Sequence, residues 1–371
     1  MKISTEPARS VELGVFLPVG SGGWITSTTS PQLPATYDYN RDVTVLAEEL
    51  GFDFALSMAK WRGYGGPSAH WDTTLESIST MAGLAEATSR IKVWATVHTM
   101  VFHPAVVAKM GAVIDQISNG RFGLNIVAGS NPSDQGQFGL WRDLDHAGRY
   151  ALAEEWITVA RRLWTEERVD FEGEFFTLTD CVSSPKPAAL PPVICAGGSD
   201  RGFKFTIDHC AGSLLQGGDD DRHIALGRRA KEIARESNKP DFKTYGLFTL
   251  VPGLTDADAQ ARVDDYNAGV DLIALENQAR EYGADTAKEN TSAKNFVQAR
   301  TDAVAVGKSA LVGSPETIAR RLAYAVREAQ LDGVTIIVPE FIDDLRVIGE
   351  QVAPLLAEFG VSTLAASGVP A

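Results

Sequence analysis

Residues 121–132 read RFGLNIVAGSNP, and this stretch decides how the rest of the chain is interpreted. Its apolar run predicts a buried strand, and Asn125 is the polar side chain within that strand. Because alternate residues of a strand share a face, Asn125 lies on the face of Gly123 and Val127. A buried amide needs hydrogen-bonding partners, which a polar planar ligand or the backbone of a nearby turn could supply. The stretch alone leaves both interpretations open.

The composition is that of a soluble globular enzyme. The chain has 371 residues, of which 44% are hydrophobic and 22% charged, and its formal net charge is -14. This acidic balance argues against a nucleic-acid partner, because such proteins concentrate Lys and Arg. No apolar run is long enough to span a membrane, and the first residues lack the pattern of a signal peptide. We therefore expect a cytoplasmic protein without a membrane partner.

Several kinds of site are not supported by the sequence. The three cysteines form no C-x-x-C pair, so neither a disulfide framework nor a zinc knuckle is indicated. The six histidines lack H-x-x-x-H and H-E-x-x-H spacing, and no metal site is expected. A serine hydrolase would need a G-x-S-x-G elbow, which the sequence lacks. Lys60 could form a Schiff base, but a lysine beside Arg62 in a loop more often makes an electrostatic contact.

Predicted strands and helices alternate along the chain. Near-continuous apolar strands in strict alternation with helices favour a parallel sheet, and eight such units favour its closure into a barrel. The expected fold class is therefore α/β, an eight-stranded (β/α)8 TIM barrel. The predicted strands are residues 11–17, 52–57, 91–98, the apolar run within 121–132, 193–199, 211–216, 245–251 and 334–338.

We expect a single barrel domain over residues 11–360, with tails at 1–10 and 361–371. A long connection separates the seventh strand from the helix that Ser314-Pro315 should begin. An insertion at about 255–312 is therefore expected, with a mobile lid as one interpretation and a surface excursion as the other. Thr73 and Glu76 have the spacing of a capping box for the helix after the second strand.

Active sites of such barrels lie at the C-terminal ends of the strands. The sequence places Ala59 with Lys60, Thr96 with His98, Asn125, and Gly198 with Ser199 at these ends. The helix that begins after Gly198 could hold a phosphate with its free N–H groups and the hydroxyl of Ser199, although the glycines could simply form the turn. Arg149 and Tyr150, at the start of another helix, could add a cation and a hydroxyl, unless Arg149 lies on the surface.

Five groups of segments carry a resemblance to a known family. They are GVFLP at 14–18, FDFALSM at 52–58, WD at 71–72 with LES at 75–77, GRFGLN at 120–125 and VICAG at 193–197. Together they are similar to the bacterial-luciferase-like flavin monooxygenases, and most of all to the members that open the uracil ring, over about residues 11–360. The resemblance implies the same barrel that the alternation of elements predicts.

The resemblance also implies a site for reduced FMN. The flavin contacts of the family fall on Ala59, Lys60, Asn125, Arg149, Tyr150 and Ser199, and the acidic contact falls on Asp134; Gly198 joins them as part of the same helix start. Thr96 and Asn125 are implied to be catalytic, because the family uses these positions to orient oxygen. Reduced FMN and O2 then attack a carbon next to nitrogen, and the protein orients the cofactor. No G-x-G-x-x-G fingerprint follows a strand, so a separate flavin reductase would supply the reduced FMN.

The chain departs from the uracil-opening members just after Asn125. Where they carry a bulky tryptophan and a glutamine, this chain has Ser130 and Asn131, which leave room for a larger ring. The other candidate substrate contacts are Trp61, Tyr64, His98 and Phe102, for which ordinary packing is the alternative. The preferred substrate prediction is therefore riboflavin, which a riboflavin lyase cuts by oxidative C–N cleavage into lumichrome and a sugar. Opening of the uracil ring is the alternative.

Two other functions remain open at this stage. Some members of the superfamily bind flavin with little turnover, so a non-catalytic flavin-binding protein is possible. A deazaflavin-dependent hydride-transfer enzyme would share the barrel and need no oxygen. We further expect the chain to form a homo-oligomer and to act on a small heteroaromatic molecule.

Overall fold

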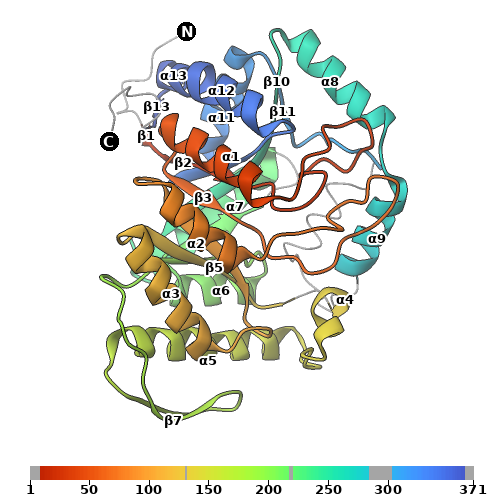
Figure 1. Cartoon of the computed structure of the whole chain (residues 1–371). Helices are drawn as coiled ribbons and strands as arrows, with labels where there is room; N and C mark the ends of the chain where they lie inside the picture. Colours follow the sequence, from red (N-terminus) through yellow and green to blue (C-terminus); the bar gives the residue numbers. More distant parts are fainter. Residues whose placement is uncertain (1–8, 130–131, 217–219, 284–302, 364–371) are drawn as a thin grey trace.

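The computed structural model describes residues 9–129, 132–216, 220–283 and 303–363 (Figure 1). Eight parallel strands form a closed barrel, because β12 pairs with β2 and β10 pairs with β9. The predicted eight-stranded α/β barrel is confirmed. Its strands are β2 (Glu12–Phe16), β3 (Phe54–Leu56), β4 (Lys92–His98), β5 (Phe122–Val127), β8 (Val193–Cys195), β9 (Gly212–Leu215), β10 (Lys243–Pro252) and β12 (Gly333–Ile337).

Helices connect successive strands and cover the outside of the barrel (Figure 1). Their inward faces are apolar, and they pack against the outward side chains of the strands in one continuous core. The connecting helices are α1 (Tyr37–Glu49), α2 (Ser77–Ala87), α3 (Pro104–Ser118), α5 (His146–Thr165), α6 (Asp200–His209), α7 (Asp220–Glu236) and α11 (Pro315–Glu328), and α12 (Phe341–Val347) follows β12, the last strand of the barrel. No helix among the described residues is long and apolar enough to cross a membrane.

The ends of several helices follow from local sequence, with one correction. Pro104 is the first residue of α3, and α3 stops at Asn119, whose left-handed φ of 55° ends the helix. The capping box predicted from Thr73 and Glu76 is wrong. Helix α2 begins later, at Ser77, and the Glu76 carboxylate itself caps it by accepting hydrogen bonds from the backbone N–H groups of Ile78 and Ser79 at 2.9 and 2.7 Å.

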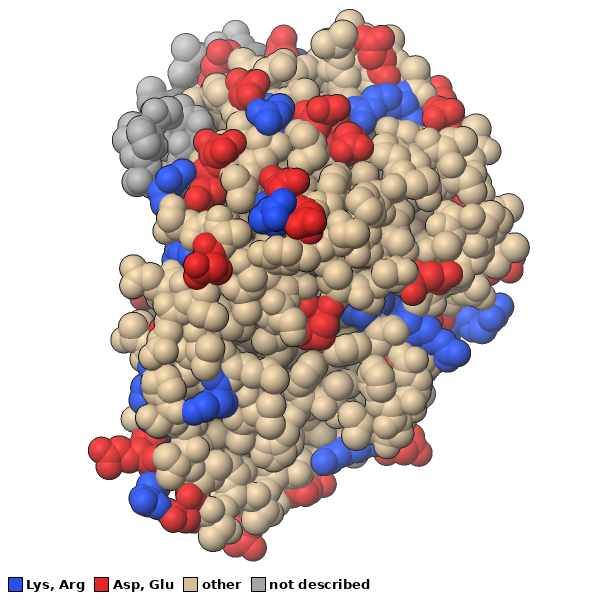
Figure 2. All heavy atoms as spheres, in the orientation of Figure 1, with Lys and Arg blue, Asp and Glu red and all other residues tan. Residues whose placement is uncertain are grey.

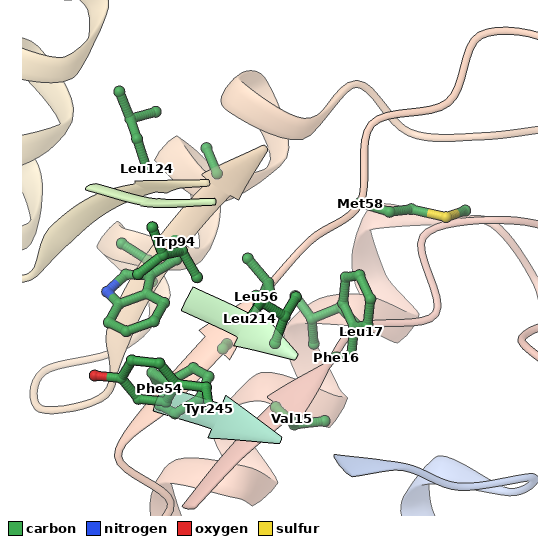
Figure 3. Close-up of a cluster of buried hydrophobic side chains, with 14 of the residues drawn as sticks. Val15, Phe16, Leu17, Phe54, Leu56, Met58, Trp94, Leu124, Leu214 and Tyr245 are labelled. Atoms are coloured by element: carbon green, nitrogen blue, oxygen red, sulfur yellow. The ribbon is translucent and has the colours of Figure 1, made fainter. Parts of the chain in front are cut away.

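Three aromatic rings close the N-terminal end of the barrel (Figure 3). Trp94 stacks on Phe54 with ring centroids 4.5 Å apart, and Tyr245 meets both rings edge-on. Neighbouring strands make room for these rings with glycine: a methyl group at Gly14 would lie 2.1 Å from the Phe54 ring, and one at Gly333 would lie 2.4 Å from Tyr245. A large ligand therefore has access only at the opposite end, where the strands finish.

The chain also forms helices and strands that are not part of the barrel. Helices α8 (Asp256–Ala268) and α9 (Leu272–Gly283) occupy the segment expected to be an insertion, and β11 (Leu311–Gly313) pairs with β10. Residues 284–302 of this expected insertion lie outside the described residues. Strands β6 (Val169–Glu172) and β7 (Thr177–Cys181) form a hairpin, and α4 (Pro132–Gln135) follows β5.

Residues 9–10 and 361–362, which were expected to belong to the two tails, form strands. Strand β1 (Arg9–Ser10) pairs with β13 (Val361–Ser362), and the Val361 side chain is fully buried. Residue 361 therefore belongs to the hydrophobic core, where its strand packs beside α11 and α13 (Ala353–Leu356).

The rings of Phe54, Trp94 and Tyr245, which we call the aromatic floor, leave no room for a side chain at Gly14. In Gly14→Ala the new methyl group would overlap the Phe54 ring, which Trp94 and Tyr245 hold in place. We expect a loss of about 1–3 kcal/mol in the free energy of unfolding, measured by urea denaturation. Gly136→Ala is the control, since its methyl group would meet its nearest atom at 3.7 Å. Equal stability of the two variants would contradict the floor as described.

Candidate functional site

Thr96 and Asn125 lie side by side at the C-terminal end of the barrel, paired in register on β4 and β5. The Asn125 Nδ2 donates to Thr96 Oγ1 at 3.0 Å, and Thr96 Oγ1 donates to the Ser57 carbonyl. These bonds fix the orientation of the amide. Within the described residues, the buried Oδ1 of Asn125 has no hydrogen-bond partner. The turn backbone thus does not satisfy this amide, and an acceptor is left for a ligand N–H.

Lys60 is buried between two carboxylates from distant parts of the chain. Its Nζ lies 3.4 Å from Asp134 Oδ1, makes a closer ion pair with Glu281, and sits 4.5 Å above the Tyr64 ring. Figure 1 shows α4 and α9, which carry the two acids, on the same side of the molecule. Burial raises the pKa of Glu281, while the positive charge of Lys60 opposes that shift. Lys60 therefore ties the loop after β3 to α4 and α9.

The Asp134 side chain also binds the backbone of the loop after β3. Its Oδ1 accepts the N–H groups of Trp61 and Arg62 at 2.9 and 2.7 Å, and its Oδ2 has no hydrogen-bond partner among the described residues. The side chain is completely buried. Asp134 thus fixes the position of Trp61, and its Oδ2 can still accept a hydrogen bond.

His98 is a neutral, buried histidine at the end of β4. The Trp61 Nε1 donates to its Nδ1 at 3.3 Å, and burial lowers the pKa of His98 to about 4, although the charge of Asp134 acts in the opposite direction. With Nδ1 accepting, the remaining proton is on Nε2. The half-buried Trp61 also lies beside Phe102, with ring centroids 6.0 Å apart.

Tyr64 is separate from this pair of rings. Its side chain is only 2% exposed, and its hydroxyl donates to that of Tyr282 at 3.2 Å. Burial raises the pKa of Tyr64 well above its ordinary value, so the phenol is neutral. The structure thus places Tyr64 beneath Lys60 in the packing of the loop. Ser130 and Asn131, the other predicted substrate contacts, lie outside the described residues.

Ser199 begins α6, as the sequence predicted. Its Oγ accepts the N–H of Gly202 at 3.0 Å and lies 3.0 Å from His146 Nε2. A methyl group at Gly197 would lie 2.8 Å from the Gly202 backbone, so only glycine lets the strand end approach the helix so closely. The half-buried Gly198 sits between them, at the start of the helix.

The first turn of α5 brings further polar groups to this helix start. Arg149 is buried and donates to the Leu144 carbonyl at 3.1 Å, so its surface alternative does not hold. The Tyr150 ring meets His146 edge-on at 5.1 Å, and its hydroxyl would be 2.6 Å from a methyl group at Gly202. A buried cation, two hydroxyls and a helix N-terminus together fit the phosphate of FMN.

Two residues of this arrangement were missed from the sequence. His146 was detectable in principle, because it precedes Arg149 and Tyr150 on the same helical face at i, i+3 and i+4. Glu281 was not, since nothing local marks which acid of a polar segment reaches Lys60, 221 residues away along the chain. Ala59, predicted as a flavin contact, is half-buried at the β3 exit next to Lys60.

Comparisons with known proteins identify the family of this chain. The family model for luciferase-like monooxygenases matches residues 11–333. Pyrimidine monooxygenase RutA of Acinetobacter baylyi is 36% identical over 350 residues, which cover 93% of this chain and 95% of that protein. The protein of the same name from Serratia proteamaculans is 38% identical over 349 residues, with the same two coverages.

A solved structure of riboflavin lyase with modified FMN and riboflavin has the same fold. It aligns with a TM-score of 0.84 over 95% of this chain and 93% of that one, at 20% sequence identity. The chain belongs to the luciferase-like monooxygenase family. The class predicted from the sequence, a flavin-dependent monooxygenase, is confirmed.

The buried state of His98 predicts a pH dependence of stability. Its pKa falls from 6.5 to about 4 on folding, so between these values the unfolded chain binds a proton that the folded chain rejects. The free energy of unfolding should therefore fall as the pH is lowered from 7 towards 4, with about 3 kcal/mol of the loss due to His98.

His98→Gln isolates this contribution, because glutamine can still accept from Trp61 Nε1 and does not titrate. Urea unfolding of both proteins at a series of pH values should give a shallower decline for the variant. The same slope in both proteins would refute the assignment.

Proposed function

We propose that this protein is a two-component monooxygenase that uses reduced FMN and O2 to oxidise a pyrimidine-type ring at a carbon next to nitrogen. The observation that carries the proposal is the 36–38% identity, over 93% of this chain, to proteins named pyrimidine monooxygenase. Riboflavin, the substrate preferred from the sequence, has weaker support. It rested on Ser130 and Asn131, which lie outside the described residues, and the likeness to riboflavin lyase is at 20% identity.

The polar groups of the site divide into two ends. Ser199, Arg149 and Tyr150 with the start of α6 would hold the phosphate of FMN, while Asn125 and Thr96 would face its ring system. When bound, reduced FMN supplies the electrons that activate O2. Asn125 presents a fixed acceptor, and the neutral His98 can donate from Nε2. Lys60, held by two carboxylates, orders the loops instead of acting as a nucleophile.

A separate flavin reductase completes the proposed system. The sequence has no G-x-G-x-x-G fingerprint after a strand with which to bind a nicotinamide cofactor. Reduced FMN would therefore arrive from another protein, and the purified chain should not oxidise NADH on its own.

The decisive experiment combines the protein with a flavin reductase, NADH, FMN and oxygen, and offers uracil or riboflavin. Chromatography should show ring-opened uracil. Asn125→Ala should retain FMN, since the phosphate contacts remain, yet lower kcat about 10²-fold, as when one positioned hydrogen-bonding group is removed. The reductase alone is the control. Lumichrome without uracil turnover would favour riboflavin, and turnover of neither ring by any amount of enzyme would favour a flavin-binding protein.

We further propose that the protein forms a homo-oligomer and that its subunits contact each other through α3. Its outer face carries the exposed side chains of Val106, Met110, Val113 and Ile117, which are 38–48% accessible and follow each other at i, i+4, i+7 and i+11. In the view of Figure 2, charged side chains are sparse over this part of the molecule. An uncharged stripe can pair with its own copy across a two-fold axis, because the same side chains then meet each other.

Val113→Lys should therefore convert the oligomer into monomers. A charge in the middle of the stripe would be buried without a partner in each copy. Molecular mass in solution, measured by light scattering or sedimentation, reports the change. Tyr324→Lys on α11 is the matched control, because Tyr324 is 57% exposed and does not belong to the stripe. A wild-type protein that is already monomeric, or an unaffected Val113→Lys oligomer, would exclude this contact.

A further inference from the structure

Gln135 is the most unusual polar side chain at the open end of the barrel. It lies in α4, is 1% exposed, and neither its Oε1 nor its Nε2 has a hydrogen-bond partner within the described part of the chain. Among the described asparagines and glutamines, it is the one buried with both ends of the amide unpaired. Such burial disfavours the folded state unless the hydrogen bonds are made at some stage.

The amide of Gln135 lies beside Gly129, just after the end of β5. A methyl group at Gly129, just after β5, would lie 3.2 Å from Gln135 Oε1 and 2.6 Å from the terminal carbon of Met100, which follows β4. This is the end of the barrel at which Thr96 and Asn125 stand. The neighbouring Asp134 also has an unpartnered oxygen, Oδ2. Gln135 therefore belongs to the polar lining of the candidate site.

The chemistry of the amide indicates what it can bind. A primary amide offers a carbonyl acceptor beside an N–H donor, and this is the complement of a ring edge in which a carbonyl stands next to a ring N–H. We propose that Gln135 binds the cyclic-amide edge of the substrate and thereby selects rings with a free N–H. This inference rests on the proposed function, and it names the part of the pyrimidine-type ring that the protein recognises.

The surroundings of Gln135 allow a ring edge to approach. Gly129 carries no side chain on the side that faces the amide, and Met100 is unbranched, so its terminal methyl group can rotate away. Until the ring arrives, the same packing keeps water from the amide. A ring that could not return both hydrogen bonds would leave the buried amide unpaired, and this penalty is the source of selectivity.

The test uses the FMN-loaded protein, uracil and 1,3-dimethyluracil, which has no ring N–H. Calorimetry should detect binding of uracil and much weaker binding of the dimethyl compound. Gln135→Met keeps the length of the side chain and removes both polar atoms, so it should weaken uracil binding about tenfold to a hundredfold. Its melting temperature should not fall, because an unpaired buried amide has been removed. Gln351→Met, at an exposed glutamine, is the control.

The outcomes separate this inference from the proposed function. No binding of uracil by the wild type, equal binding of the two compounds, or undiminished binding by Gln135→Met would overturn the role of Gln135. A lower melting temperature with weaker FMN retention would show a structural role and overturn it too. If uracil binding depends on Gln135 but reduced FMN, O2 and the reductase yield no product, the oxygenase proposal fails while the recognition of the ring edge stands.

Discussion

The buried ammonium group of Lys60 is the interaction on which the open end of the barrel depends. A buried charge is tolerated only when it is paired, so the loop after β3, α4 and α9 must come together around it. Asp134, one of the two acids that pair with Lys60, also accepts hydrogen bonds from the backbone N–H groups of Trp61 and Arg62. Trp61 in turn donates to His98. One cation thus sets the positions of groups on four segments of the chain.

The closed end of the barrel explains why the polar groups gather where they do. Phe54, Trp94 and Tyr245 fill the interior at the N-terminal end, and the Tyr245 hydroxyl is bound by Glu12, which also pairs with Lys92. With that end filled by rings and closed by charges, a planar cofactor can enter only where the strands finish. The same strand β4 that supplies Trp94 to the floor supplies Thr96 and His98, on the same face, to the open end.

The barrel and part of its site were predictable from sequence because both depend on local periodicity. Apolar strands alternate with amphipathic helices, and a residue such as Asn125 or Ser199 is placed by the strand that precedes it. Glu281 and the pairing of Val361 with Arg9 depend on contacts between distant segments, for which no local pattern exists. The cap of α2 was misassigned because Thr73 and Glu76 have the spacing of a capping box. The helix instead begins three residues later than that spacing predicts, and Glu76 is its N-cap.

Buried polar atoms without a hydrogen-bond partner among the described residues occur in several parts of the fold, and one group of them lies at the open end of the barrel. Lys60 and Arg149 are buried charges, and each already makes hydrogen bonds or ion pairs within the chain. Asn125 Oδ1, Asp134 Oδ2 and the amide of Gln135 are equally buried, yet none has a partner among the described residues. All three side chains lie on β5 or on α4, which follows it. A folded chain keeps such unpaired groups at a cost in stability, and a ligand with matching N–H and carbonyl groups would recover that cost on binding. Hydrogen bonds formed to these unpaired groups would therefore contribute to the binding free energy of a polar planar molecule.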